Sequence, residues 1–285
     1  TPDGLLEMRV AVQGPRGSSY SLQSQRRQFP RAVLMRDQET RKWQEGEEDA
    51  PEWTEAHGDA GSSFSLSPDG KSVAYEANLE GRRQIFVRDV EASEGKLLFA
   101  YPESCQEPRF SPDGSRLAFS TQADGFAQVF VYDRKSRLTE NWSRGSHHDG
   151  SACWAPDGKS LVVSREGSAL VRLTPGGSKV LVEDTGGWNS APACSPDGKT
   201  LAFMSNQDGN PEIYTLTLAS GKLQRLTEDP AYDTDPQYSP DGQRLLFLST
   251  PEGGRTRLFS MNPDGTRRSP LAAPDSSVGA VAWLP

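Results

Sequence analysis

Ser239-Pro240-Asp241-Gly242 separates two stretches of the chain that read as β-strands, Pro236-Gln237-Tyr238 before it and Leu245-Leu246-Phe247 after it. Proline presets the backbone angle φ for the second position of a type I turn. Aspartate bonds back to nearby N–H groups, and glycine accepts the left-handed conformation that follows. Apolar residues on both sides of such a turn are typical of paired strands. The stretch therefore predicts a strand, a tight turn and a second strand.

The same pattern recurs along the chain, with turn prolines at positions 68, 112, 156, 196 and 240 and spacings of 44, 44, 40 and 44 residues. Each repeat contains two further predicted strands, for example Ile213–Leu216 and Gln224–Thr227. Four strands in about 40 to 45 residues is the size of one blade of a β-propeller. The repeat therefore predicts an all-β propeller of four-stranded antiparallel blades.

The two ends of the chain suggest how the ring closes. Pro2-Asp3-Gly4 is a turn without a preceding strand, and Ala280–Leu284 is a strand without a following turn. We expect the C-terminal strand to complete the N-terminal blade as its innermost strand, beside Leu6–Val12, because a shared blade locks a propeller with ordinary ladder hydrogen bonds. Six turns then predict six blades.

The predicted organisation is a single propeller over residues 1–285. Its first blade spans 2–66 plus the closing strand 279–285, with a basic insertion near 13–30 and an acidic one near 45–61. These insertions are interpreted as solvated loops or as protrusions that meet a partner. The other blades are expected at 68–110, 112–154, 156–194, 196–238 and 240–278.

Composition limits the classes of function. The net charge of −8 would repel nucleic acid. No apolar run is long enough to cross a bilayer, and the start at Thr1 is interpreted as that of a mature chain. The cysteines, Cys105, Cys153 and Cys194, lie at different depths of their repeats with no CxxC spacing. They predict neither a disulfide framework nor a zinc site, and are expected to be small buried residues.

No catalytic motif is present in the sequence. Neither Gly-x-Ser-x-Gly nor His-Glu-x-x-His occurs, and the only histidines are His57, His147 and His148. The neighbouring pair His147-His148 would point to opposite sides of an extended chain, which disfavours joint metal ligation. The sequence therefore predicts a non-catalytic protein.

Alignment on the turn prolines brings acidic residues together at one mouth of the expected central channel. Glu107 and Asp235 stand five residues before the proline; Asp149, Asn189 and Asp233 stand seven before it. Crowded carboxylates repel unless a cation neutralises them. This predicts binding of a basic peptide end or of Ca²⁺, with Asp149, Asp233 and Asp235 as metal ligands. The alternative is that these residues only cap the start of the inner strand.

Aromatic residues edge the same mouth one position further out. A rim of aromatics and acids is typical of a peptide-binding surface. The predicted binding residues are Glu107, His148, Asp149, Trp188, Asn189, Tyr232, Asp233 and Asp235.

The repeats Pro-x-aromatic-Ser-Pro-Asp-Gly, followed by segments such as Asn206–Tyr214 and Leu226-Thr227, resemble the Pro-Asp propeller repeats of the TolB family. The resemblance covers residues 64–285 clearly and 1–63 weakly, and it implies a periplasmic or cell-envelope protein that binds proteins or peptides, such as an envelope lipoprotein. Separately, we expect the protein to be a monomer. Similar repeats occur in propellers that gate prolyl-oligopeptidase-type serine peptidases, which gives an alternative function. A propeller lyase or hydrolase would need clustered histidines that this sequence lacks.

Overall fold

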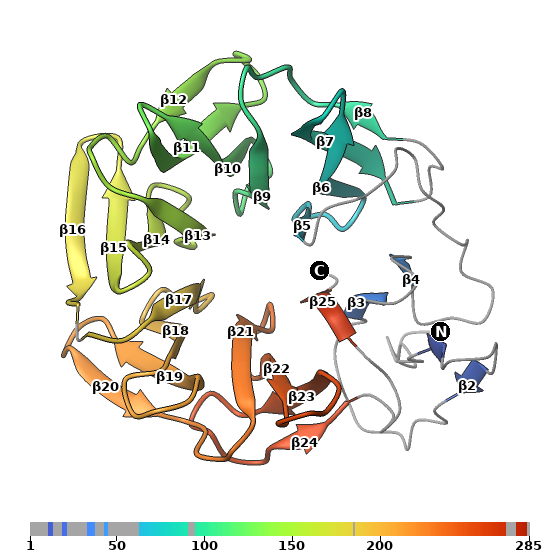
Figure 1. Ribbon diagram of the computed structural model, residues 1–285, viewed down its shortest axis with the longest axis vertical. Coiled ribbons are helices and arrows are strands. Elements are labelled where there is room, and N and C mark those ends of the chain that lie inside the picture. The colour runs from blue at the N-terminus through green and yellow to red at the C-terminus, as the bar shows by residue number, and fades with distance from the viewer. Residues whose placement is uncertain are drawn as a thin grey trace, which may run out of the picture.

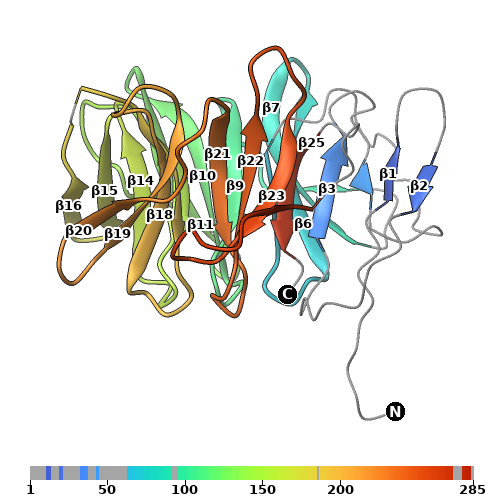
Figure 2. The ribbon, with the colours of Figure 1, turned by 90° about the horizontal axis from the view of Figure 1, so that it is seen from below.

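The computed structural model describes residues 11–13, 19–21, 33–37, 43–44, 63–90, 95–184, 186–271 and 278–283, with side chains for 63–90, 95–184, 186–271 and Trp283. Its sheets are arranged around a central axis, with the first strand of each blade on the inside (Figure 1). Seen from the side, the molecule is a thick disc whose strands run between its two faces (Figure 2). Among these residues no helix is long and apolar enough to cross a membrane.

Five four-stranded antiparallel blades follow one another along the chain. Their strands are β5 (Phe64–Leu66), β6 (Ser72–Leu79), β7 (Arg82–Asp89) and β8 (Lys96–Leu97); β9 (Cys105–Phe110), β10 (Arg116–Ala123), β11 (Phe126–Asp133) and β12 (Thr139–Asn141); β13 (Asp149–Trp154), β14 (Leu161–Arg165), β15 (Ala169–Thr174) and β16 (Gly177–Val182); β17 (Asn189–Cys194), β18 (Thr200–Ser205), β19 (Glu212–Thr217) and β20 (Lys222–Arg225); β21 (Tyr232–Tyr238), β22 (Leu245–Thr250), β23 (Arg257–Met261) and β24 (Ser269–Pro270).

The Pro-Asp-Gly turn joins the inner strand of each blade to the second strand, and its side chains explain the repeated sequence. In the turn after β9, Ser111 Oγ donates to Asp113 Oδ1 (2.6 Å) and accepts the N–H of Arg116 (2.9 Å). Asp113 Oδ1 also accepts the N–H of Ser115 (3.1 Å). The glycine that follows, Gly114, has a φ of 70°, which favours a residue without a Cβ. The turn is thus held by its own side chains.

The prediction of six four-stranded blades is wrong. Besides the five blades, the described residues form a three-stranded sheet of β25 (Val278–Trp283), β3 (Val33–Asp37) and β4 (Trp43–Gln44), which lies between the last blade and the first (Figure 1). The C-terminal strand does pair with an N-terminal segment, but Val281 faces Met35 and Trp283 faces Val33. The expected partner was Leu6–Val12.

The expected partner segment lies elsewhere. Ala11 and Val12 belong to β1 (Ala11–Gln13), which pairs only with β2 (Ser19–Ser21) in a separate two-stranded sheet of the described residues. The turn at 2–4 lies outside the described residues, as do residues 5–10 and most of the insertions near 13–30 and 45–61. Val33–Asp37 instead occupies the position next to the inner strand of the closing sheet, β25.

The hydrophobic core lies between blades. One cluster joins Ile85 of β7 to Leu117 and Phe119 of the next blade, and another joins Val162 and Leu170 to Leu201 and Phe203. Tryptophans of the inner strands also form hydrogen bonds between neighbouring sheets. Trp154 Nε1 donates to Arg109 O of the preceding blade (3.0 Å). Trp283 Nε1 donates to Gln237 O in the same way (3.4 Å). The closing sheet therefore meets β21 through the same contact that an ordinary blade uses.

Candidate functional site at the front rim

Four of the inner strands, β9, β13, β17 and β21, share a left-handed bulge five residues before the turn proline. Glu107, Ser151, Ala191 and Asp235 have φ values of 54°, 49°, 48° and 52°. The strand register shifts at each of these positions. A bulge redirects a side chain and turns backbone groups away from the ladder. The sequence alignment grouped these positions correctly, but it contained no sign of the left-handed backbone.

Glu107 connects two neighbouring blades. Its Oε2 accepts the backbone N–H of Ser151 (2.8 Å) and the hydroxyl of Ser120 (3.0 Å). Arg109 makes the corresponding link on the other side, where Nη1 donates to Ser63 Oγ (3.0 Å) and to Phe64 O (3.1 Å). Both charged groups therefore have fixed positions on β9, at the inner edge of the ring.

Asp235 stands on β21, which faces β9 across the axis (Figure 1). Asp235 as a whole residue is exposed, but the surrounding protein partly desolvates its carboxyl and this raises its pKa. The Thr234 hydroxyl and the positive charge of Arg109 lower the pKa and partly oppose this effect. The negative charge of Glu107 raises the pKa further. The axis thus carries two acids, Glu107 and Asp235, called the channel acids below, and one arginine.

Asp149 and Asp233 occupy equivalent places at the start of β13 and β21. Asp149 is buried and forms a bidentate pair with Arg165, its register partner on β14, at 2.8 and 2.9 Å. This favours the structural alternative for Asp149, because its charge is already balanced. Asn189 holds the same position on β17, where it is buried and its Nδ2 donates to Ser168 O.

Asp233 is less well satisfied than Asp149. It is fully buried, neither of its carboxylate oxygens has a hydrogen bond, and the nearest cation is Arg268, whose Nη2 lies 3.5 Å from Oδ2. Burial raises the pKa of Asp233 to about 6. The nearby Ser249 side chain and the positive charge of Arg268 favour the charged carboxylate, but they offset only part of this rise. Arg268 also pairs with Asp229 and stacks over Phe247 and Phe259, with its guanidinium carbon 5.0 and 4.8 Å from the ring centroids.

Three aromatic side chains mark the end of the ring at which the inner strands begin, called the front rim below. They are His148, Trp188 and Tyr232, from three consecutive blades, and they are named the rim arc here. Trp188 is 65% exposed and Tyr232 54% exposed, although large rings usually pack inside. His148 is also exposed; its Nδ1 accepts the N–H of Ala127 (3.0 Å), so a neutral ring carries its proton on Nε2.

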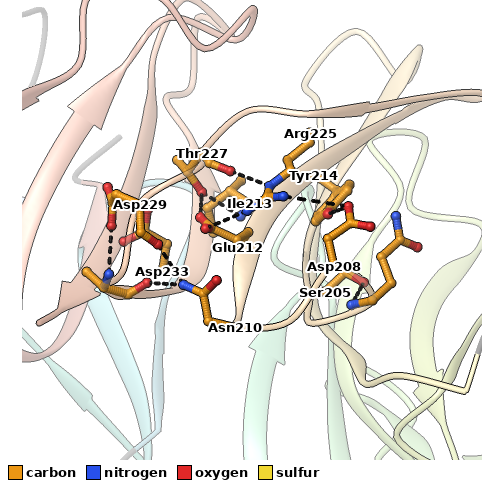
Figure 3. A network of polar contacts seen from close by, with 12 residues as sticks. Ser205, Asp208, Asn210, Glu212, Ile213, Tyr214, Arg225, Thr227, Asp229 and Asp233 are labelled. Atoms are coloured by element: carbon orange, nitrogen blue, oxygen red, sulfur yellow. Dashed lines mark hydrogen bonds and ion pairs between the residues drawn. The ribbon is translucent and has the colours of Figure 1, made fainter. Parts of the chain in front are cut away.

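A polar network holds the segment that leads to Tyr232 (Figure 3). Glu212 accepts from Arg225 (2.9 Å) and from Thr227, whose hydroxyl in turn accepts the N–H of Ile213 (2.9 Å). Asn210 Nδ2 donates to the carbonyls of Asp229 and Ala231, both at 2.7 Å. These bonds fix residues 226–231 before β21 begins, so the ring of Tyr232 is presented by an ordered backbone.

The residues predicted as metal ligands are not gathered into one site. Among the described residues, no group of three or more histidine, cysteine, aspartate or glutamate side chains could hold a metal ion. Asp149 pairs with Arg165, Asp233 lies beside Arg268, and Asp235 lies on the axis. The two partner arginines were missed at the sequence level. The one available signal for Arg165 was its place at the end of the strand after Asp149, because an antiparallel pairing of the two strands puts these residues opposite each other.

The fold resembles several solved structures. TolB from Acinetobacter baumannii aligns with a TM-score of 0.73 and 24% identity over 89% of this chain and 66% of that one. A protein from Agrobacterium tumefaciens described as TolB gives 0.69 and 20%, covering 89% of this chain and 98% of that one. A puromycin-hydrolysing peptidase from Mycobacterium tuberculosis gives 0.64 and 17%, covering 84% and 42%.

The match to a family model is more specific than these likenesses of fold. The model named TolB beta propeller domain matches residues 61–173 and again 166–283, which together span most of the chain. The matched residues include the five Pro-Asp-Gly turns that follow the inner strands of the four-stranded blades and the whole rim arc. The chain belongs to the TolB beta propeller family, as its repeated turns suggest.

Proposed function

We propose that this propeller is a non-catalytic binding module that holds a peptide segment of a partner protein at the front rim. The observation that carries the proposal is the rim arc, in which three consecutive blades present an exposed ring at equivalent positions. Exposed aromatics on an ordered backbone lose little conformational freedom on binding and are frequent energetic centres of interfaces.

The charges of the axis suggest the chemistry of the bound segment. The channel acids lie inward of the rim arc, whereas Asp149 is paired with Arg165 and Asp233 lies 3.5 Å from Arg268. A lysine, arginine or free amino terminus entering the axis would be attracted to Asp235 and Glu107. The proposed ligand is therefore an extended peptide that places apolar side chains on the rim arc and a cation on the axis.

Family membership supports a place for this protein in the bacterial cell envelope, with an envelope protein, such as a lipoprotein, as the partner. The proposal needs no metal ion and treats the protein as a monomer.

The test compares proteins retained from an envelope fraction by immobilised wild type and by the double variant Trp188→Ala/Tyr232→Ala. We expect at least one protein to be retained by wild type and to fall about tenfold or more with the variant, because each aromatic centre contributes about 2 kcal/mol. Binding of that purified protein is then measured by calorimetry with Asp235→Asn, which should weaken it and reduce its dependence on salt.

The matched control is Leu138→Ser, which removes another exposed apolar side chain (70% exposed) at the opposite end of a blade. Leu138 lies in the loop after β11, at the end of the blade where the Pro-Asp-Gly turn is found. The last residue of β11, Asp133, pairs with Arg116, which stands two residues after the turn glycine. Leu138→Ser should retain the partner like wild type. Equal retention of every protein by wild type and the rim variant would refute the front rim as the contact surface.

A second candidate is the gating propeller of a serine peptidase, favoured by the likeness in fold to the puromycin-hydrolysing peptidase from Mycobacterium tuberculosis. In that case a catalytic domain would contact either the front rim or the opposite end of the ring, where the Pro-Asp-Gly turns lie. A parent gene that encodes a Gly-x-Ser-x-Gly segment beside this propeller would support this alternative.

A further inference from the structure

Two of the three cysteines meet across a blade boundary. Cys153 lies on β13 and Cys194 on β17, the inner strands of consecutive blades, and their Sγ atoms are 2.7 Å apart. The distance is within about 1 Å of the disulfide bond length of about 2.05 Å. Both cysteines are thiols in the structure, and each is partly accessible to solvent.

The positions of the two cysteines in their repeats explain why they meet. Cys153 stands three residues before its turn proline and Cys194 stands two before its own. Successive side chains of a strand point to opposite faces, so these positions face opposite neighbours. Trp154, two before its proline, contacts the preceding blade through Arg109 O, which shows the direction of that face. Cys153 therefore points forward and Cys194 points back.

We propose that Cys153 and Cys194 form a disulfide that joins two consecutive blades of the propeller. The oxidant is a small-molecule or protein disulfide. One cysteine thiolate attacks a sulfur of that disulfide, forms a mixed disulfide and releases one thiol. The second cysteine thiolate then attacks the mixed bond and releases the other thiol. The pair loses two electrons and two protons in total, and the oxidant becomes two thiols.

The surroundings of the two cysteines favour a stable disulfide over one that forms and breaks rapidly. The Cys153 thiol and burial raise the pKa of Cys194 well above its ordinary value, and the charge of Arg172 only partly opposes this. The raised pKa of Cys194 disfavours its thiolate at neutral pH, which slows bond formation through this residue. The bond would tie together the blades that carry His148 and Trp188, two members of the rim arc.

Counting free thiols tests the proposal directly. The whole chain is incubated with oxidised glutathione at pH 8, quenched with acid, denatured and labelled with N-ethylmaleimide. We expect one label per chain after oxidation and three in the reduced sample, since Cys105 is fully buried and has no cysteine neighbour within bonding distance among the described residues. Peptide mapping should find Cys153 linked to Cys194 in monomeric protein.

Stability provides a second readout. Reduction of the oxidised wild type should lower Tm by on the order of 5 °C, because the bond closes a long loop in the unfolded chain. Cys105→Ala should keep this difference, and Cys153→Ser should abolish it. Three labels after oxidation, a chain-to-chain disulfide, or a shift of Tm that survives in Cys153→Ser would overturn the proposal. The label count on wild type decides the question even if a variant folds poorly.

Discussion

Asp233 is the residue whose charge is most poorly balanced in the candidate site. Its pKa rises from the ordinary value of 3.8 to about 6, because burial displaces water from the carboxyl. Well below pH 4 the carboxyl is neutral in both the folded and the unfolded state, so its burial costs no charge desolvation there. Above about pH 6 it is charged in both states, and its burial lowers the free energy of unfolding by about 3 kcal/mol.

We therefore predict that Asp233→Asn stabilises the protein at pH 7 relative to its effect at pH 4. The difference in free energy of unfolding between variant and wild type should rise by about 2 to 3 kcal/mol from pH 4 to pH 7, as the wild-type carboxylate becomes charged. Urea unfolding across that range measures the difference. A difference that does not depend on pH would contradict the raised pKa.

Asp197→Asn serves as a control of opposite sign. The Ser195 hydroxyl and the Lys199 N–H lower the pKa of Asp197, so its carboxylate stabilises the folded state above the unfolded pKa. That contribution is lost as the pH falls through the folded pKa. The control variant should therefore be less stable than wild type at pH 7, and the two should converge in acid.

Individual residues also set the limit of what the sequence could predict. Alignment on the turn prolines placed Glu107 and Asp235 at one equivalent position of their repeats, and the aromatic residues of the rim arc at another. It gave no sign of Arg268, which lies 35 residues after Asp233 and reaches it through folding. Cys153 and Cys194 stand three and two residues before their turn prolines, and this difference argued against a pair at the level of sequence. Two side chains that meet between neighbouring blades require such a difference, because one must point forward and the other back.

At the scale of elements, one of the five turns lacks a side chain that the other four have. Ala155 replaces serine in the turn after β13, where the backbone bonds are unchanged: Ala155 N donates to Ser160 O and Gly158 N to Ala155 O, both at 2.9 Å. In the next blade Ser195 Oγ donates to Asp197 (2.7 Å) and accepts the N–H of Thr200 (2.9 Å).

Ala155→Ser should consequently stabilise the protein by about 1 kcal/mol, because it adds hydrogen bonds to a backbone that already has the required shape. Chemical denaturation of the variant measures the gain. Ser195→Ala is the reverse change in the neighbouring blade and should cost about 1 to 2 kcal/mol. A loss of stability in Ala155→Ser would show that this turn differs from its relatives in more than one hydroxyl.

The bulges of the inner strands allow a second test at this scale. Ala191 has a φ of 48°, a conformation that costs a residue with a Cβ about 1 kcal/mol and costs glycine little. Ala191→Gly should therefore raise the free energy of unfolding by up to about 1 kcal/mol. Ala193→Gly, two residues later on the same strand, should lower it by about 0.5 to 1 kcal/mol. Equal effects of the two variants would contradict the left-handed bulge.

The turns and strands were predictable because local residues determine them. Proline, aspartate and glycine impose the turn, and alternating apolar residues define the strands on both sides. The bulges were not predictable, because Glu, Ser and Ala occupy three of the four positions and these types do not signal a positive φ.

At the scale of the whole molecule, Trp283 connects the closing sheet to the last blade. Its ring is 9% exposed, and its indole N–H donates to Gln237 O. Trp283→Ala should cost about 3 to 5 kcal/mol, through the loss of buried area and the cavity that remains. Urea unfolding should show the loss, and Trp188→Ala, which removes an exposed ring, should leave stability within about 0.5 kcal/mol of wild type.

The number of blades could not be predicted from periodicity. The 66 residues between Pro2 and Pro68 offer more than one apolar stretch that could pair with the C-terminal strand, including Leu5–Val12 and Val33–Asp37. The spacing of the later turns does not choose between them. The choice depends on contacts between distant parts of the chain, and the structure pairs β25 with β3.

This pairing has a consequence for the order of events during synthesis. Each of the five blades consists of consecutive strands, so it can assemble on the ribosome soon after its own residues emerge. The sheet of β25, β3 and β4 cannot form until residue 283 has left the exit tunnel, although β3 precedes all five four-stranded blades in the chain. Until then β3 and β4 are a nascent hairpin without a third strand, and a chaperone has that interval in which to bind it.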